Sequence, residues 1–73
     1  MIKFTKHANH KFKILRRHNF SVPKNQVLKT VLEPDLIDYS RRPLVIAQRK
    51  IDRHHVLRVV YKIEGESKTI ITF

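Results

Sequence analysis

Two cations share one face of the most strand-like stretch in the sequence, residues 55–63. Successive side chains of a strand point to opposite faces, so Arg58 and Lys62 stand among valines. The other face is apolar and suited to packing under helices; it holds Leu57, Val59, Tyr61 and Ile63. A cation inside an apolar strand needs a partner. Arg58 is therefore our first candidate for a phosphate ligand, and the alternative is an ion pair with Asp35 or Asp38.

The preceding stretch, residues 44–51, has the alternation of a second strand. Gln48 and Lys50 fall on one face of it. If the two strands form a hairpin, both side chains can join Arg58 on one polar floor. An ordinary solvated face explains Gln48 and Lys50 equally well.

Histidines raise the question of a metal site. His7 and His10 lie one helical turn apart, and His54 and His55 are adjacent. Ligands spaced i, i+3 can share a metal ion, but a closed site needs more ligands. The chain has no cysteine, and no acidic residue lies close to His7 and His10 in sequence. We therefore expect no metal and no cofactor.

Charge is the most informative bulk property. The chain has 16 Lys and Arg against 6 Asp and Glu, and residues 1–32 contain no acid. Such a one-sided field attracts polyanions and makes their binding salt-dependent. Nucleic acid is the predicted partner; an acidic protein partner, or mere solubility, is the alternative. The cations expected to contact phosphates are Lys11, Arg16, Arg17, Arg41, Arg42 and Arg58.

The chain of 73 residues is short enough for a single domain, residues 1–73. No apolar run approaches the roughly 18 residues that a membrane span needs. Charges interrupt the N-terminal segment too often for a signal peptide. A cytoplasmic protein is the expectation.

The elements that would position these residues follow from periodicity. Thr5 is expected to cap a helix over 6–18, stopped by Asn19, and a second helix starts near Ser21 and runs over 23–32. A short connection, whose Phe20 and Val22 return to the core, predicts an αα-hairpin. Strands are predicted over 1–5, 36–39, 44–51, 55–63 and 68–73. The fold class is α+β, in the order β-α-α-β-β-β-β, with two N-terminal helices packed on one face of a mostly antiparallel sheet.

Several short motifs together resemble a known family. They are Lys6-His7-Ala8, Pro34-Asp35, Ile46-Ala47-Gln48, residues 56–61 and Ile70-Ile71-Thr72. The sequence is similar to an uncharacterised family of small prokaryotic proteins near the RelE/BrnT-like toxins of type II toxin–antitoxin systems. The resemblance implies a RelE-like sheet with helices on one side and metal-independent RNA cleavage, like that of an mRNA interferase. It also implies two partners: RNA, free or as ribosome-bound mRNA, and a small acidic antitoxin.

Metal-free cleavage needs a base, an acid and cations beside the phosphate. His7, at a helix start, is the predicted acid or base, because an imidazole changes charge near neutral pH. Arg58 would then stabilise the phosphate charge. The alternative for His7 is a hydrogen bond that fixes how the helix enters the fold. Three functions stay open: an endoribonuclease toxin, a non-catalytic nucleic-acid-binding module, and an interaction module for an acidic protein.

Overall fold

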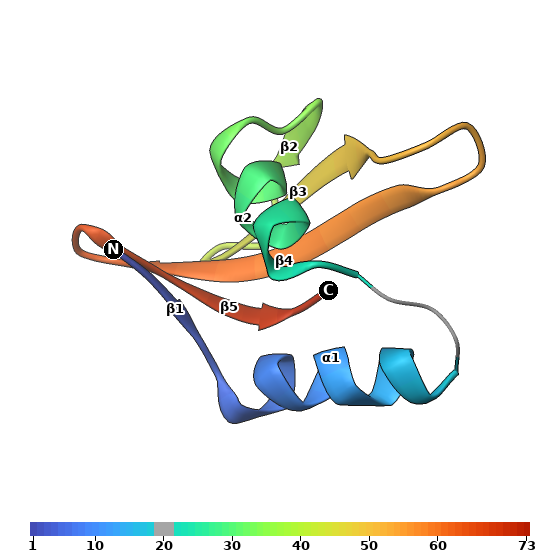
Figure 1. The fold of residues 1–73 in the computed structure, drawn as a ribbon. Helices are drawn as coiled ribbons and strands as arrows, with labels where there is room; N and C mark the ends of the chain where they lie inside the picture. The colour runs from blue at the N-terminus through green and yellow to red at the C-terminus, as the bar shows by residue number, and fades with distance from the viewer. Residues whose placement is uncertain (19–21) are drawn as a thin grey trace.

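The protein forms one five-stranded sheet that carries two helices (Figure 1). A computed structural model describes residues 1–18 and 22–73. In chain order the elements are β1 (Ile2–Phe4), α1 (Lys6–Arg17), α2 (Lys24–Leu32), β2 (Leu36–Asp38), β3 (Leu44–Lys50), β4 (Val56–Glu64) and β5 (Ser67–Thr72). The predicted class and element order are confirmed.

The sheet has the order β1-β5-β4-β3-β2. Three hairpin-like pairs are antiparallel, whereas β1 lies parallel to β5, with Phe4 beside Ile70. Gly65 takes a φ of 63° in the turn between β4 and β5, a conformation that glycine adopts without strain. In this order the first and last strands of the chain, β1 and β5, are neighbours, and the two edge strands of the sheet are β1 and β2.

One face of the sheet holds the core. Val59 and Ile70 have no exposed surface and Tyr61 has 1 %. Ala8 of α1 and Val27 of α2 are equally buried and belong to the same apolar cluster. These strand residues alternate with more exposed ones, and both helices pack on them, so both helices cover the same face and the other face carries no helix (Figure 1).

The predicted cap of α1 is confirmed. The Thr5 side chain accepts a hydrogen bond from the backbone N–H of Ala8 at 3.1 Å, and its own backbone N–H donates to the carbonyl of Ile70. At the other helix, Arg49 donates to the carbonyl of Glu33, which ends α2. Both helices are therefore fixed to particular strands.

The predicted αα-hairpin is wrong. Helix α1 lies over β5 and β1, while α2 lies over β4 and β3, and their axes run in very different directions (Figure 1). Each helix buries its apolar residues against its own pair of strands, which removes their apolar surface from water.

Most predicted boundaries hold within two residues, and Val22 is buried as expected. Three predictions lie outside the described residues: Asn19 as the end of the first helix, Phe20 as a core residue, and Ser21 as the start of the second helix. Two apolar residues expected to face the core are exposed, Leu32 by 65 % and Ile63 by 47 %, because each lies at the end of its element.

Candidate nucleic-acid interface

The face of the sheet without helices, called here the open face, carries four cations. Strand alternation and register place them on three strands; they are Lys3, Lys50, Arg58 and Lys62. All four are exposed. Between them lie Gln48, Thr69 and Thr72, together with aliphatic side chains. The open face is thus a cationic surface on an aliphatic floor.

Arg58 and Gln48 are direct cross-strand neighbours, as predicted for a hairpin of β3 and β4. Lys50 lies two residues further along β3, on the same face, beside Val56. Its backbone N–H donates to the carboxylate of Asp35 at 2.9 Å, so Asp35 ties β2 to β3. A guanidinium and a carboxamide side by side can both donate hydrogen bonds to one anion.

A second row of polar residues crosses the sheet about four residues from Arg58. Lys3 pairs with Thr69, and Thr69 pairs with Lys62. Four residues of strand span about 13 Å, so this row and the Arg58 row lie about that far apart. Lys3 was not among the predicted site residues. Its alternation between Ile2 and Phe4 marked its face, but only the parallel pairing of β1 with β5 brings it to Lys62.

The cations of the open face form no ion pairs among the described residues. In the described residues, the only ion pair joins His55 to Asp52, at 2.9 Å, so no Lys or Arg has a carboxylate partner. The carboxylates on the open face are Asp38 of β2 and Glu64 at the end of β4. Hydrogen bonds from the Ser40 side chain and backbone N–H, with smaller effects from the charges of Arg41 and Arg58, lower the pKa of Asp38. Arg58 therefore lies near this carboxylate without forming the ion pair that was the alternative explanation for it.

Two lysines on the helix-covered face have structural roles. The ammonium of Lys24 lies 4.5 Å from the ring centre of Phe4, and that of Lys68 lies 5.5 Å from the ring centre of Tyr61. Tyr61 is almost fully buried, as predicted, and burial raises its pKa. These cation–π contacts give both ammonium groups a structural role.

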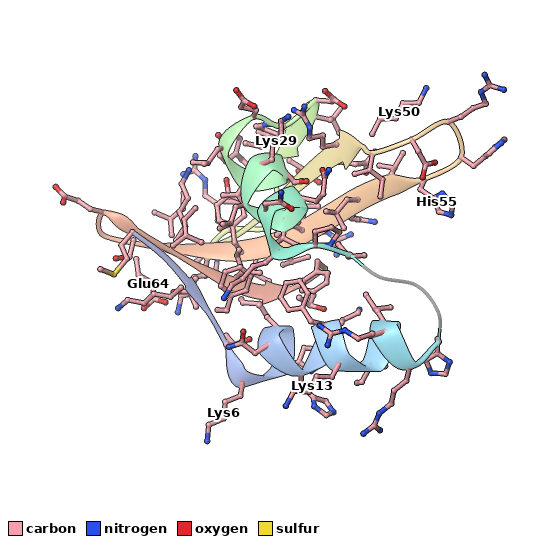
Figure 2. All side chains as sticks on the ribbon, viewed as in Figure 1. Lys6, Lys13, Lys29, Lys50, His55 and Glu64 are labelled. Carbon is pink, nitrogen blue, oxygen red and sulfur yellow. The ribbon has the colours of Figure 1, made fainter. Side chains whose placement is uncertain are left out.

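The predicted phosphate contacts on α1 form a separate surface. Arg16 and Arg17 are exposed in its last turn, and with Lys13 they line a shallow hollow of about 370 Å³. Figure 2 shows Lys6 and Lys13 projecting from α1 away from the sheet. Lys11 is half-buried. Cations in a last helical turn also favour the helix dipole, which gives Arg16 and Arg17 a structural role of their own.

His7 is exposed in the first turn of α1, directly before the buried Ala8. Because α1 covers the core face and Arg58 stands on the open face, the fold places these two predicted catalytic residues on different sides of the sheet. The described residues show no hydrogen bond from the His7 ring either. A single reaction centre using both side chains is therefore not assembled.

The remaining predicted residues lie in turns. Arg41 and Arg42 are exposed between β2 and β3, where the Arg42–Pro43 peptide bond is cis. His54 and His55 lie in the turn between β3 and β4, and Asp52 accepts hydrogen bonds from the His54 backbone and the His55 ring. Within residues 1–18 and 22–73, no group of three or more His, Asp or Glu side chains could hold a metal ion.

Comparisons of this chain with known protein families, with curated proteins and with solved structures found no match. The similarity to RelE/BrnT-like toxins therefore stays a prediction. Among the described helices, none is both long enough and apolar enough to cross a membrane.

Proposed function

We propose that this protein binds single-stranded RNA, with the open face contacting the phosphates. The observation that carries the proposal is the set of four exposed, unpaired cations on a sheet face that no helix covers. Phosphate contacts supply most of the affinity in non-specific nucleic-acid binding, and each one displaces counterions. The net charge of +10 adds attraction at long range.

The composition of the open face favours backbone contacts over base recognition. Its described residues are cations, Gln48, threonines, aliphatic side chains and the carboxylates Asp38 and Glu64, without an aromatic ring on which a base could stack. Binding through this face should therefore be tolerant of sequence. With four phosphate contacts, the logarithm of the association constant should fall with the logarithm of salt concentration with a slope of about −3.

The test is fluorescence anisotropy of a labelled RNA of about ten nucleotides, titrated at several salt concentrations. Arg58→Ala should weaken binding and make the slope shallower by about 0.7, the value for one lost contact on a single strand. The matched control is Lys29→Ala, which removes the same charge from the exposed surface of α2 on the other side of the sheet. Equal effects of the two substitutions would contradict binding through the open face.

Metal-independent RNA cleavage, as in a toxin neutralised by a small acidic antitoxin, is the second candidate. It is supported by the arrangement that the RelE/BrnT resemblance implies, a sheet with helices on one side, and by the position of Arg58 on the open face. His7 does not lie beside Arg58, so a base must come from elsewhere. Asp38 is the carboxylate whose pKa the charge of Arg58 helps to lower, and that lowered pKa makes it a weak base; Glu64, the other carboxylate on that face, lies six residues along β4 from Arg58. For that reason binding is the better-supported function.

A further inference from the structure

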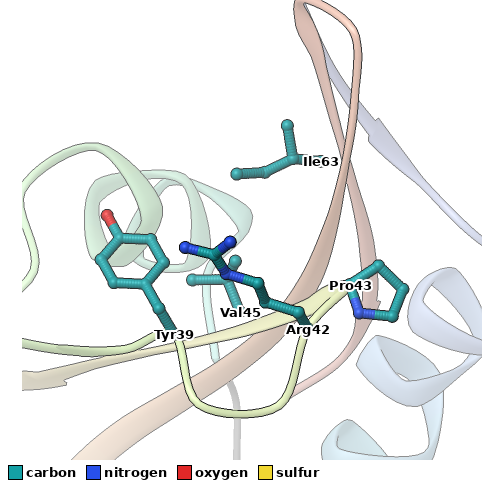
Figure 3. Close-up of a pocket in the computed structure, with 5 residues that line it drawn as sticks. All are labelled: Tyr39, Arg42, Pro43, Val45 and Ile63. Atoms are coloured by element: carbon teal, nitrogen blue, oxygen red, sulfur yellow. The ribbon is translucent and has the colours of Figure 1, made fainter.

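A pocket opens at the end of the sheet, beside the turn between β2 and β3. It has a volume of about 540 Å³ and is lined by Tyr39, Arg42, Pro43, Val45 and Ile63. Figure 3 shows Tyr39 and Arg42 rising from the turn, with Ile63 of β4 across from them. This volume lies within the usual range for small-molecule sites. None of the lining residues is acidic.

The lining combines three kinds of surface. Val45 and Pro43 supply an apolar floor and Ile63 an apolar wall, and 47 % of Ile63 is exposed. Tyr39 is 52 % exposed, so its ring is accessible at the mouth. Arg42 is exposed and has no carboxylate partner among the described residues. A flat ring attached to a phosphate group matches this combination, since aromatic faces stack on one another and a guanidinium binds phosphate.

The pocket lies at the end of the sheet on the helix-covered face, because Val45 and Ile63 point to the same face as the buried Tyr61, opposite Lys62. Lys62 precedes Ile63 on β4, and its cross-strand neighbour Leu44 follows Pro43. Lys62 stands on the open face about 13 Å along the strand from Arg58. A strand of RNA held at Arg58 and Lys62 on the open face therefore turns over the end of the sheet, past Lys62 and Leu44, to place a nucleotide in the pocket.

We infer that this pocket binds one unstacked nucleotide of the RNA strand, whose base stacks on Tyr39 above Val45 and Pro43 while Arg42 contacts its phosphate. The inference rests on the proposed RNA binding and deepens it. The open face lacks an aromatic ring, and the pocket supplies one. It also makes the ligand single-stranded, because a base paired in a duplex cannot enter.

The experiment compares two labelled RNAs of about ten nucleotides, one complete and one in which every base is absent but the sugar-phosphate chain is kept. Tyr39→Ala should weaken binding of the complete RNA roughly 5- to 150-fold, the range for loss of one base stack, and leave the abasic RNA unchanged. Tyr39→Phe keeps the ring and should bind like the wild type. Ile63→Trp fills the pocket without changing charge and should reproduce the effect of Tyr39→Ala.

The outcomes separate this inference from the proposal on which it rests. If Arg58→Ala weakened RNA binding but Tyr39→Ala and Ile63→Trp changed the affinity for neither RNA, nucleotide binding in the pocket would be refuted and RNA binding by the open face would stand. An apolar side chain of a protein partner would then be the better occupant. Equal weakening of complete and abasic RNA by Tyr39→Ala would also overturn base stacking. If the wild type bound neither RNA at low salt, the proposed function and the pocket would fail together.

Discussion

Thr5 joins the first strand, the first helix and the last strand, so its side chain should matter to stability far more than its size suggests. Its hydroxyl oxygen accepts the N–H of Ala8 at 3.1 Å, which caps α1. The same hydroxyl donates to the carbonyl of Ile71 in β5 at 3.3 Å. Both contacts are partly buried. Thr5→Ala removes them together.

The expected loss follows from those two contacts. An N-cap threonine contributes typically about 1 kcal/mol. The longer bond to Ile71 adds a further contribution at the low end of the range for hydrogen bonds, about 0.5 to 1 kcal/mol. The sum, about 1.5 to 2 kcal/mol, is a large part of the roughly 4 to 11 kcal/mol expected for a domain of this length. The midpoint of thermal unfolding should fall by about 6–16 °C.

Urea denaturation followed by circular dichroism measures this loss. The control is Thr5→Ser, which keeps the hydroxyl and should retain most of the stability. A loss below about 0.5 kcal/mol for Thr5→Ala would refute the capping argument. So would equal destabilisation by the serine and alanine variants, because it would place the effect in the methyl group.

Ile70→Val should lower the thermal midpoint by about 4–8 °C, since Ile70 is fully buried and loss of a buried methyl group costs about 1 kcal/mol. The control is Ile71→Val at the partly exposed neighbouring residue, which should lower the midpoint less. Calorimetry measures both midpoints. Asp38→Asn should be destabilising at neutral pH, because a lowered pKa contributes stability above the ordinary value of 3.8 that is lost as pH falls through the pKa of the folded state. The difference in the free energy of unfolding between Asp38→Asn and the wild type, measured by urea denaturation, should therefore shrink below about pH 4. A difference that stayed constant with pH would contradict the hydrogen bonding of Asp38. If the protein is a toxin, its induced expression should arrest growth. Arg58→Ala should relieve the arrest and His7→Ala should not. Relief by a folded His7→Ala variant would contradict this and return His7 to the candidate site.

Local patterns in the sequence predicted the elements well. The alternation of residues 55–63 marked both faces of β4, and Thr5 was recognised as a helix cap. Gln48 and Arg58 could be placed together because a hairpin between consecutive strands is a local pairing. In such cases the residues that decide the structure lie close together in sequence.

The rest depended on contacts between distant segments. Nothing local indicated that β1 pairs in parallel with β5, which adds Lys3 to the open face. The local sequence is compatible with His7 and Arg58 in one site, but the packing of α1 on the core face puts them on different sides of the sheet. The pocket likewise combines Tyr39 with Ile63, residues that meet only once β3 pairs with β4 and the turn closes beside them.

The most direct test of RNA binding by the open face is an NMR titration of the ¹⁵N-labelled protein with a single-stranded RNA of about ten nucleotides. We expect the largest amide shifts at Gln48, Arg58 and Lys62, with smaller shifts at the exposed Lys29 of α2. Shifts centred on Lys13, Arg16 and Arg17 of α1, with the amides of β3 and β4 unchanged, would contradict the proposal and move the interface to the helix.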